Sequence, residues 1–593
     1  MRTFERFPNL VTMFFARAAE LGDKPFLSRK LDGDWTHTSW REAAQQVACL
    51  SDGLRKLELE RGDRVMLVSE NRPEWCIADL AIMAAGFVTV PTYTTNTTRD
   101  HEHILSNSGA KAVIVSTAKL ARTLLPAVMR TTECNDIVGI EDLRIGQAGD
   151  ARTHLWRDLI RGEDGDIATC AAQAATLKRE DLACIIYTSG TGGAPRGVRQ
   201  HHGAILHNVE ACLDAIAEDL GWEEEVFLSF LPPSHAFEHS AGQMLPIGMG
   251  ARIAYAESLE KLAANMEEVK PTLVIVVPRL FEVLRARILK AVQKQGGVSR
   301  YLLGRALTIG ARKAAGRPFL LDKPMDLLLG RTLRPKVGKR FGGRIKAFIC
   351  GGAPLNPEVG TFFQSLGLTV QQGYGQTEAG PVISCNRPRV GIDMRTVGRP
   401  LLNTEVRFAD DGEILVRGEL VMHGYWRAEA ETARVLRDGW LHTGDIGHFD
   451  ARGRIVITDR KKDLIVNDKG DNVAPQRIEG MLTLEPEILQ AMVTGDRRPY
   501  LVGVIVPDPE WAMEWAHGRG IETAEADPAF VKALSAAVDR VNAGLSTVEK
   551  VRRIIVADAP FNIENEQLTP SMKIRRHVIR GVYGERLDAL YKK

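Results

Sequence analysis

Residues 182–198 read Leu-Ala-Cys-Ile-Ile-Tyr-Thr-Ser-Gly-Thr-Gly-Gly-Ala-Pro-Arg-Gly-Val, and this stretch decides the fold class. Its first six residues form a short apolar run, which is typical of a strand buried in a parallel sheet. Hydroxyl side chains, glycines and a cation follow directly. Glycine-rich backbone can turn successive N–H groups toward a phosphate, and arginine adds a fixed positive charge. The candidate phosphate ligands are Thr188, Ser189, Gly190, Thr191, Gly192 and Arg196.

A flexible surface loop is the plainer interpretation of these glycines. The loop also lacks the Gly-Lys-Ser/Thr spacing of a Walker A motif. The order of strand, hydroxyls, glycines and cation nevertheless favours phosphate binding. Short apolar strands alternate with helical periodicity around this loop, which predicts βαβ units and buried parallel sheets. Helices are expected at 40–57 and 74–86, and strands at 65–68, 87–91, 112–115, 226–230, 273–277 and 347–350.

The texture of the sequence changes after about residue 400. Strand and turn signals come closer together there, which predicts an antiparallel or barrel-like subdomain. A further unit begins near residue 461, with short strands expected at 491–494 and 501–506. The segment 296–340 is rich in Lys, Arg, Gly and Leu, and we expect it to be a helical insertion at the surface. Its charge is interpreted as a solvated face.

Length and composition bound the function. A chain of 593 residues exceeds the roughly 250–300 residues that one core supports, so at least two domains are expected. The 77 basic and 75 acidic side chains leave a net charge of +2, which argues against a nucleic-acid binder. Eight cysteines without a CxxC pair, and an N-terminus unlike a signal peptide, predict a cytoplasmic location. No apolar stretch approaches the ~20 residues of a bilayer span, although peripheral membrane contact stays open.

The stretch 187–198 resembles the phosphate-loop signature of the adenylate-forming superfamily, which includes acyl-CoA synthetases, firefly luciferase and the adenylation domains of peptide synthetases. Two residues depart from the usual TSGTTG-x-PKG pattern, namely Gly192 in place of Thr and Arg196 in place of Lys. Arginine keeps the charge in a planar fork, but one hydroxyl is lost. The sequence leaves the effect of both changes on activity open.

Further segments extend the resemblance through the nucleotide site. The stretch 350–354 resembles one wall of the family's adenine pocket, formed by Gly351, Gly352, Ala353 and Pro354. The stretch 373–378 resembles the second signature. It implies that Gly373 and Tyr374 flank the adenine, with Tyr374 stacked on it, and that Thr377 contacts phosphate. Glu378, together with Thr188, would hold Mg²⁺, a metal that prefers carboxylate and phosphate oxygens.

The later motifs imply the ribose site, the hinge and the catalytic lysine. Asp445 in the stretch 440–445 corresponds to the family's ribose ligand, and Arg460 to a nucleotide contact. Lys462 occupies the position of the hinge residue. Lys469 and Gly470 correspond to a loop that faces coenzyme A. Lys573, within Leu-Thr-Pro-Ser-Met-Lys-Ile-Arg-Arg, corresponds to the catalytic lysine.

The resemblance implies an α/β architecture. A large N-terminal domain of stacked α/β sheets plus a β-barrel-like subdomain would span 1–459. A small mobile α+β C-terminal domain would span 460–593, with the hinge near 460–462. The implied activity is that of an AMP-forming acyl-CoA synthetase, which uses ATP, Mg²⁺ and coenzyme A. The sequence carries no information on the oligomeric state.

Two segments resemble the long-chain branch of the family. These are Leu-Pro-Pro-Ser-His-Ala-Phe-Glu at 231–238, where His235 would lie near the carboxylate, and Val-Pro-Arg-Leu-Phe-Glu at 277–282. A medium- or long-chain fatty acid is therefore the expected substrate. Met244 and Met249 could line an apolar tunnel, although core positions are the plainer interpretation. An aryl-CoA ligase, an acyl-AMP ligase that serves a carrier protein, and a non-catalytic nucleotide-binding relative remain as alternatives.

Overall fold

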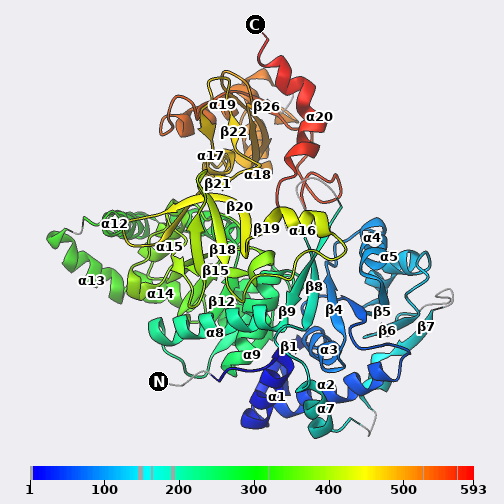
Figure 1. Ribbon diagram of the computed structural model, residues 1–593. Helices are drawn as coiled ribbons and strands as arrows, with labels where there is room; N and C mark the ends of the chain where they lie inside the picture. The colour runs from blue at the N-terminus through cyan, green and yellow to red at the C-terminus, as the bar shows by residue number, and fades with distance from the viewer. Residues whose placement is uncertain are drawn as a thin grey trace.

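The computed structural model describes residues 5–144, 151–161, 165–188, 194–294, 296–317, 319–524, 527–569 and 572–592. Four of the candidate phosphate ligands, Ser189, Gly190, Thr191 and Gly192, lie outside these ranges. Two large α/β sheets, an antiparallel sheet and a separate C-terminal unit make up the described chain (Figure 1).

The first large sheet has seven strands, in the order β7-β6-β5-β3-β4-β8-β9. All neighbours pair in parallel except β8 and β9, which are antiparallel. The strands are β3 (Arg64–Val68), β4 (Val88–Thr92), β5 (Ala110–Val115), β6 (Asp136–Gly139), β7 (Arg152–Leu155), β8 (Leu182–Thr188) and β9 (Arg196–His201). The associated helices are α2 (Trp40–Arg55), α3 (Pro73–Ala84), α4 (Thr98–Ser108), α5 (Ala118–Val128), α6 (Trp156–Ile160) and α7 (Ile167–Ala174).

The second large sheet has nine strands, in the order β16-β15-β14-β13-β12-β10-β11-β1-β2. The strands are β1 (Pro25–Leu31), β2 (Asp34–Ser39), β10 (Val226–Ser229), β11 (Arg252–Tyr255), β12 (Leu273–Val276), β13 (Ala347–Cys350), β14 (Val370–Gly375), β15 (Val382–Cys385) and β16 (Arg399–Pro400). Helices near it are α1 (Leu10–Leu21), α8 (His202–Asp219), α9 (Leu245–Met249), α10 (Leu262–Val269) and α15 (Pro357–Ser365), with a π-helical segment η1 (Glu238–Met244).

One apolar cluster joins the two large sheets. It contains buried residues from both sheets and from α3 and α8, whose apolar side chains pack between them. Helix α3 shows why the sequence places it there, because eleven of its twelve residues are buried. A helix that is apolar on every side must be covered on every side. The stacking expected for this region is therefore confirmed.

The antiparallel sheet follows in sequence. It runs β17-β18-β20-β19, with β21 pairing the second half of β20. Its strands are β17 (Glu405–Phe408), β18 (Glu413–Arg417), β19 (Leu436–Arg437), β20 (Trp440–Phe449) and β21 (Ile455–Arg460), and α16 (Glu429–Val435) precedes β19. No pairing among the described strands joins the two ends, so the sheet is open and antiparallel. The expectation of a barrel-like subdomain is corrected to that extent.

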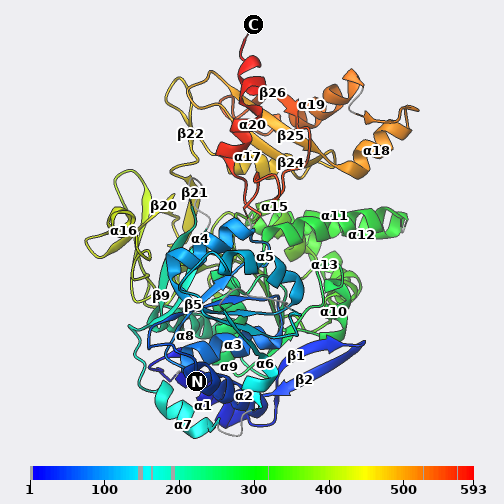
Figure 2. The same ribbon diagram turned by 90° about the vertical axis from the view of Figure 1, so that its right-hand side faces the viewer.

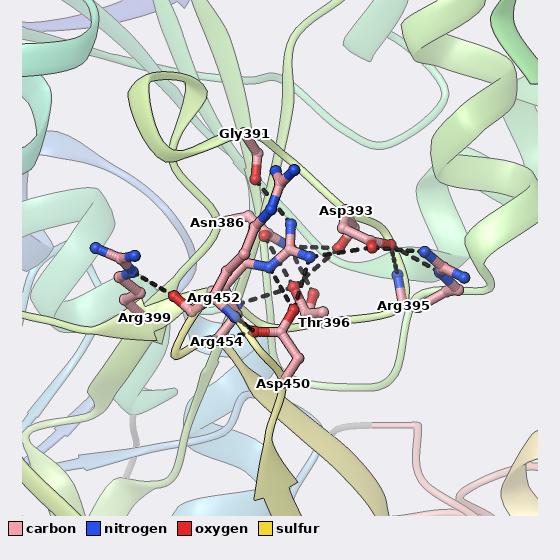
Figure 3. A network of polar contacts seen from close by, with 10 residues as sticks. Asn386, Gly391, Asp393, Arg395, Thr396, Arg399, Asp450, Arg452 and Arg454 are labelled. Carbon is pink, nitrogen blue, oxygen red and sulfur yellow. Dashed lines mark hydrogen bonds and ion pairs between the residues drawn. The ribbon is translucent and has the colours of Figure 1, made fainter. Parts of the chain in front are cut away.

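A polar network anchors this sheet to the rest of the large region (Figure 3). Arg454, the residue just before β21, donates to Asp450 Oδ2 at 2.7 Å and to the carbonyl of Gly391 at 3.1 Å. Its second terminal nitrogen lies 3.3 Å from Asp393 Oδ2. Arg454 is buried, and a buried guanidinium requires this many partners. The network therefore holds the base of β21, the strand that leads into the C-terminal unit.

The C-terminal unit has its own apolar cores. It is built on β24 (Ile488–Thr494), β25 (Leu501–Pro507) and β26 (Val551–Val556), where β24 and β25 are antiparallel and β25 and β26 are parallel. Two clusters of buried residues lie entirely within residues 465–587. Figure 2 shows this unit above the rest, connected through β21. The other elements are β22 (Ile465–Val466), β23 (Asn472–Val473), α17 (Pro475–Leu482), α18 (Pro509–His517), α19 (Pro528–Asn542) and α20 (Arg576–Ala589).

The segment expected to be a surface insertion is helical and largely exposed. It contains α12 (Gly297–Ala314), a 3₁₀ turn η2 (Leu320–Asp322), α13 (Lys323–Arg331) and α14 (Leu333–Arg340), and it follows α11 (Pro278–Lys294). Short 3₁₀ turns also occur at η3 (Thr377–Ala379) and η4 (Pro388–Val390). Among the described residues, no helix combines the length and hydrophobicity that a bilayer span requires. No disulfide joins any of the eight cysteines.

Candidate active site

A cavity of about 630 Å³ lies where the large region meets the C-terminal unit. Both large sheets, the antiparallel sheet and the C-terminal unit contribute to its walls. Most of the candidate residues in the described part of the chain line this one cavity. They are Thr188, Arg196, His235, Gly351, Gly352, Gly373, Tyr374, Thr377, Glu378, Asp445, Arg460, Lys462 and Lys573.

The phosphate-loop candidates are held at both ends. Thr188 closes β8, Arg196 opens β9, and the two residues are direct partners in the antiparallel ladder. The loop between them therefore begins and ends at the cavity wall. Residues 189–193 themselves lie outside the described part of the chain.

Asp445 lies at the centre of the polar end of the cavity. The strand register places it opposite Arg460, whose Nε is 3.3 Å from Asp445 Oδ1. The hydroxyl of Tyr374 donates to Oδ2 at 2.7 Å. Burial raises the pKa of Asp445, while Arg460 and the tyrosine hydroxyl oppose that shift. The carboxylate is thus oriented by two partners within the cavity.

Lys573 reaches the same end from the C-terminal unit. Its backbone N–H donates to Thr569 Oγ1 at 3.0 Å, and Thr569 N–H donates to the Lys573 carbonyl at 2.8 Å. These two bonds fix the turn that carries the side chain. Burial and the positive charge of Arg460 together lower the pKa of Lys573 to about 8, although Asp445 and Glu378 act in the opposite direction. Lys573, Asp445 and Glu378 all line the same cavity.

Glu378 has a partner that the sequence motifs do not include. The hydroxyl of Tyr425 donates to Glu378 Oε1 at 2.8 Å, and the guanidinium of Arg196 lies over the Tyr425 ring, 4.6 Å from its centre. The bridge between Val198 and Tyr425 brings the two segments together. Sequence reasoning missed Tyr425 because only the fold brings it to Glu378. The one available signal was an aromatic pair, Tyr425-Trp426, directly after a glycine.

The donor set is compatible with Mg²⁺. Among the described residues, no group of three or more His, Cys, Asp or Glu side chains could hold a metal ion on its own. A single carboxylate at Glu378, with the hydroxyl of Thr188 in the same cavity, suits a metal that keeps waters and takes substrate phosphates as ligands. Mg²⁺ is therefore expected to arrive with the nucleotide.

His235 borders the junction between the polar and apolar parts of the cavity. The N–H of Phe237 donates to His235 Nδ1 at 3.1 Å, so the neutral imidazole carries its proton on Nε2. Burial lowers the pKa of His235 to about 4, and Lys573 adds to that shift. His235 is therefore neutral near pH 7 and can donate one hydrogen bond from Nε2.

Another part of the cavity wall is apolar. Its lining side chains come from β8, α8, η1, α9 and β13, and they include Ile186, Cys212, Ile216, Ala241, Leu245 and Ile349. Met244 and Met249 are buried in the core cluster and do not line the cavity, which is the plainer of the two interpretations. The apolar wall and the charged end belong to one continuous space, so a molecule with a carboxylate head and an apolar body fits it.

Four candidate residues lie elsewhere in the described structure. Ala353 and Pro354 are exposed and do not line the cavity, unlike Gly351 and Gly352. Lys469 and Gly470 lie in a turn organised by Asn467, whose side chain accepts from Lys469 N–H at 2.9 Å. Gly470 has φ +88°, a conformation that favours glycine. This turn also does not line the cavity.

Residues 460–463 connect the antiparallel sheet of the large region to the C-terminal unit. Lys461 pairs with Asp411 and, at 3.2 Å, with Glu413 of the antiparallel sheet, and its N–H donates to the Gly444 carbonyl at 2.8 Å. Lys462 is exposed and makes no ion pair within the described residues. Gln476 of α17 donates to Asp463 Oδ2 at 3.0 Å. Lys461 therefore contacts the antiparallel sheet, whereas Asp463 contacts the C-terminal unit.

The fold and this cavity define a nucleotide-dependent enzyme class, and comparison with known families agrees. Residues 14–426 match the AMP-binding enzyme family, and residues 462–593 match the AMP-binding enzyme C-terminal domain. The chain belongs to the AMP-binding enzyme family, so the resemblance seen in its motifs is confirmed.

Individual relatives extend over nearly the whole chain. Long-chain-fatty-acid–CoA ligase FadD15 of Mycobacterium tuberculosis is 33% identical, over 99% of this chain and 97% of that protein. The peroxisomal long chain acyl-CoA synthetase 7 of Arabidopsis thaliana is 30% identical, over 94% and 82%. Among solved structures, the adenylation domain of a carboxylate reductase from Mycobacterium chelonae has a TM-score of 0.77 at 21% identity, over 99% and 92%. That likeness confirms the fold.

Proposed function

We propose that this enzyme is a fatty-acid–CoA ligase of the long-chain type. It would activate a fatty acid with ATP to an acyl-AMP and then transfer the acyl group to coenzyme A. One observation carries the proposal: Lys573, Asp445 and neutral His235 line the same cavity as a set of apolar side chains that includes Ile216, Leu245 and Ile349. The full-length similarity to long-chain-fatty-acid–CoA ligases supports the substrate class.

In the first step, a carboxylate oxygen of the acid attacks the α-phosphorus of ATP. The bond from that phosphorus to the bridging oxygen breaks, and pyrophosphate leaves with the electron pair. Because anions must be brought together, catalysis is positioning and charge neutralisation. Lys573 would bridge the carboxylate and an α-phosphate oxygen. Asp445 would accept hydrogen bonds from the ribose, and His235 Nε2 would donate to the acid's carboxylate.

The residues around the phosphates divide this work. Arg196 and the backbone of its loop would hold the β- and γ-phosphates, with Thr377 at the α-phosphate. Glu378 and Thr188 would hold Mg²⁺. When bound, that ion neutralises phosphate charge. Tyr374 borders the expected adenine position, next to Gly351 and Gly352.

In the second step, the thiol sulfur of coenzyme A attacks the acyl carbon. The bond from that carbon to the AMP oxygen breaks, AMP leaves with the electron pair, and the thiol proton is released. Lys573 occupies the polar end in the present arrangement, whereas Lys469 and Gly470 lie away from it. We place the domain boundary between residues 459 and 460. Rotation about Lys462 would withdraw Lys573 and bring the 469–470 turn toward coenzyme A.

The proposal also covers the setting of the enzyme. We infer a cytoplasmic location, with peripheral contact to a membrane that supplies the fatty acid. The alternatives keep the fold and change the chemistry. An aryl-CoA ligase would prefer a flat acid, an acyl-AMP ligase would pass the acyl group to a carrier protein, and a non-catalytic relative would only bind nucleotide.

Acid-dependent exchange of pyrophosphate into ATP tests the first step. Acids from acetate to oleate, together with benzoate, are compared in this assay, and thioester is then measured with free coenzyme A. We expect the highest kcat/KM with medium or long chains and thioester as the final product. Preference for benzoate, acyl-AMP without thioester, or no exchange with any acid would each select one of the three alternatives.

A further inference from the structure

We propose that the helical insertion after α12 forms a surface that docks on anionic lipid membranes. This inference deepens the proposed function, since it names the face through which a ligase for a membrane-derived acid would meet its source. The docking surface is defined by Phe319, Leu320, Leu321, Leu327 and Leu328, with the cations of α13 and α14 around them. It lies apart from the catalytic cavity, which none of these residues lines.

The apolar side chains of this surface are unusually exposed. Leu320 and Leu321 are 73% and 76% exposed, and Leu327 is 57% exposed. Phe319 and Leu328 are 52% and 46% exposed. Single exposed leucines are ordinary, but five large apolar side chains within ten residues form a patch that calls for a partner.

The apolar core of the insertion does not contain these residues, although the Phe319 ring lies under the guanidinium of Arg312. A small core of Ala306, Ile309 and Leu329 holds α12 and α13 together. Leu329 is fully buried, whereas the two residues before it in the same helix face outward. The helix therefore has enough apolar contact to fold without Leu327 and Leu328. Figure 1 shows α13 at the outer edge of the large region.

The charge around the patch is strongly positive. Residues 312–340 contain nine Lys and Arg and only two Asp, in a chain whose net charge is +2. Both aspartates already form ion pairs with cations of the insertion. Asp322 binds Arg305 at 3.1 Å and Arg312 at 2.8 Å, whereas Asp326 binds Lys313 at 2.8 Å and Arg334 at 2.7 Å.

The remaining cations are left for an external anion. Within the described part of the chain, Lys323, Arg331, Lys336 and Lys339 make no ion pair, and all four are exposed. Lys323 and Arg331 lie on α13, which also carries Leu327 and Leu328, and Lys336 and Lys339 lie on the next helix, α14. This combination excludes a simple solvated face, because a solvated face has no use for the leucines.

An interfacial membrane anchor inserts leucines into the bilayer and keeps its cations at the bilayer surface. An anionic bilayer satisfies both at once, since headgroup phosphates attract the cations and the acyl boundary accepts the leucines. An acidic protein would satisfy the charge, but it would need a groove or strand edge to order the leucines. The exposed side chains here project from a short turn and a nine-residue helix.

Sedimentation with lipid vesicles tests the proposal on the full-length enzyme. Vesicles of phosphatidylcholine with phosphatidylglycerol should bind the protein, vesicles of phosphatidylcholine alone should bind it far less, and added salt should weaken binding. The pair Leu320→Ser and Leu321→Ser should lower the partition coefficient by about tenfold or more. Lys323→Gln and Arg331→Gln should lower it by about fivefold for each charge removed.

The controls separate docking from folding and from catalysis. Met129→Ser removes another exposed apolar side chain, 60% exposed, from the end of α5 and should leave vesicle binding unchanged. Each variant should keep wild-type pyrophosphate exchange with a short-chain acid. Vesicle binding without ligase activity would overturn the proposed function and leave the docking surface standing. Three results would overturn the docking surface. They are a wild-type protein that fails to bind anionic vesicles, a leucine variant that binds them as strongly as wild type does, and a protein that binds polyglutamate in a salt-sensitive way without binding vesicles.

Discussion

The hydroxyl of Tyr425 donates a 2.8 Å hydrogen bond to Oε1 of Glu378. The same ring lies under the guanidinium of Arg196. Burial raises the pKa of Tyr425, and the neighbouring Glu378 raises it further, so the phenol stays a donor. One tyrosine thus orients both the proposed metal-binding carboxylate and the cation of the phosphate loop. Because Arg196 replaces the usual lysine, its planar group can rest on this ring.

Removing this hydroxyl should weaken the binding of Mg²⁺ at the site. Tyr425→Phe keeps the ring under Arg196 but leaves Glu378 without its donor. A hydrogen bond to a charged group contributes about 1.5–3 kcal/mol, so the apparent KM for Mg²⁺ in pyrophosphate exchange should rise by roughly tenfold or more. Tyr301→Phe, on the exposed face of α12, is the matched control. An unchanged Mg²⁺ dependence would show that the hydroxyl does not orient Glu378.

The pKa of Lys573 predicts the pH dependence of adenylate formation. Burial lowers that pKa to about 8, and the bridge between carboxylate and phosphate requires the protonated ammonium. The kcat/KM for ATP should therefore be full below about pH 7 and decline as the pH rises through 8. Removing a donor of this kind costs about 10²–10³ in rate, which is the loss expected for Lys573→Ala.

The conservative variant makes this assignment specific. Lys573→Arg keeps a charge that does not titrate below about pH 12, so its residual activity should not decline near pH 8. His235 has a pKa of about 4 and should not contribute to the decline in activity near pH 8. If wild type and Lys573→Arg show the same alkaline decline, another group controls it.

The hinge proposal separates the two half-reactions. No hydrogen bond within the described residues uses the N–H of Lys462, so proline at this position removes no contact in the adenylating arrangement. Proline would fix the backbone torsion that the rotation needs. Lys462→Pro should therefore keep pyrophosphate exchange within about twofold and slow thioester formation by at least tenfold. Lys462→Ala should keep both, and an equal loss in both half-reactions would contradict rotation at this residue.

The strand and helix pattern was predictable from the sequence because it is local. The apolar run 182–187 and the helix at 74–86 appear within one residue or two of their predicted bounds, since short buried strands and all-apolar helices have clear periodicity. The antiparallel sheet was predicted from its turns. Its open form could not be predicted, because ring closure depends on which strand edges meet.

The same difference between local sequence patterns and long-range pairing applies to the residues that line the cavity. Residues in strongly patterned motifs, such as Glu378 and Asp445, were identified because each motif is contiguous. Tyr425 was not, because it reaches the site only through the bridge between its segment and Val198. Ala353 and Pro354 are exposed because the chain turns outward after Gly352, which has φ +82°.

A buried ion pair should dominate the stability of the C-terminal unit. Arg576 binds both oxygens of Glu479, at 2.7 and 2.5 Å, and Val493 N–H donates to the same carboxylate at 2.7 Å. Arg576→Ala leaves Glu479 buried and unpaired, which should cost about 3–5 kcal/mol. Hydrogen exchange of amides in β24 and α17 measures this loss. Arg586→Ala breaks an exposed pair on the same helix, with Asp558 at 2.8 Å, and should cost about 1 kcal/mol or less.

The last prediction concerns the close approach of Gly351 to Phe237. A Cβ built on Gly351 would lie 2.9 Å from Cζ of the Phe237 ring, a separation that carbon atoms do not tolerate. Gly351→Ala should therefore displace the ring into the cavity and raise the KM for ATP by about tenfold, at little cost in stability. Gly584→Ala, where no atom lies within 4 Å, is the matched control. Adding Phe237→Leu to Gly351→Ala should restore part of the ATP affinity, because the shorter side chain no longer meets the new methyl group. If the double variant binds ATP as weakly as Gly351→Ala alone, the effect of the methyl group is on the backbone path rather than on Phe237.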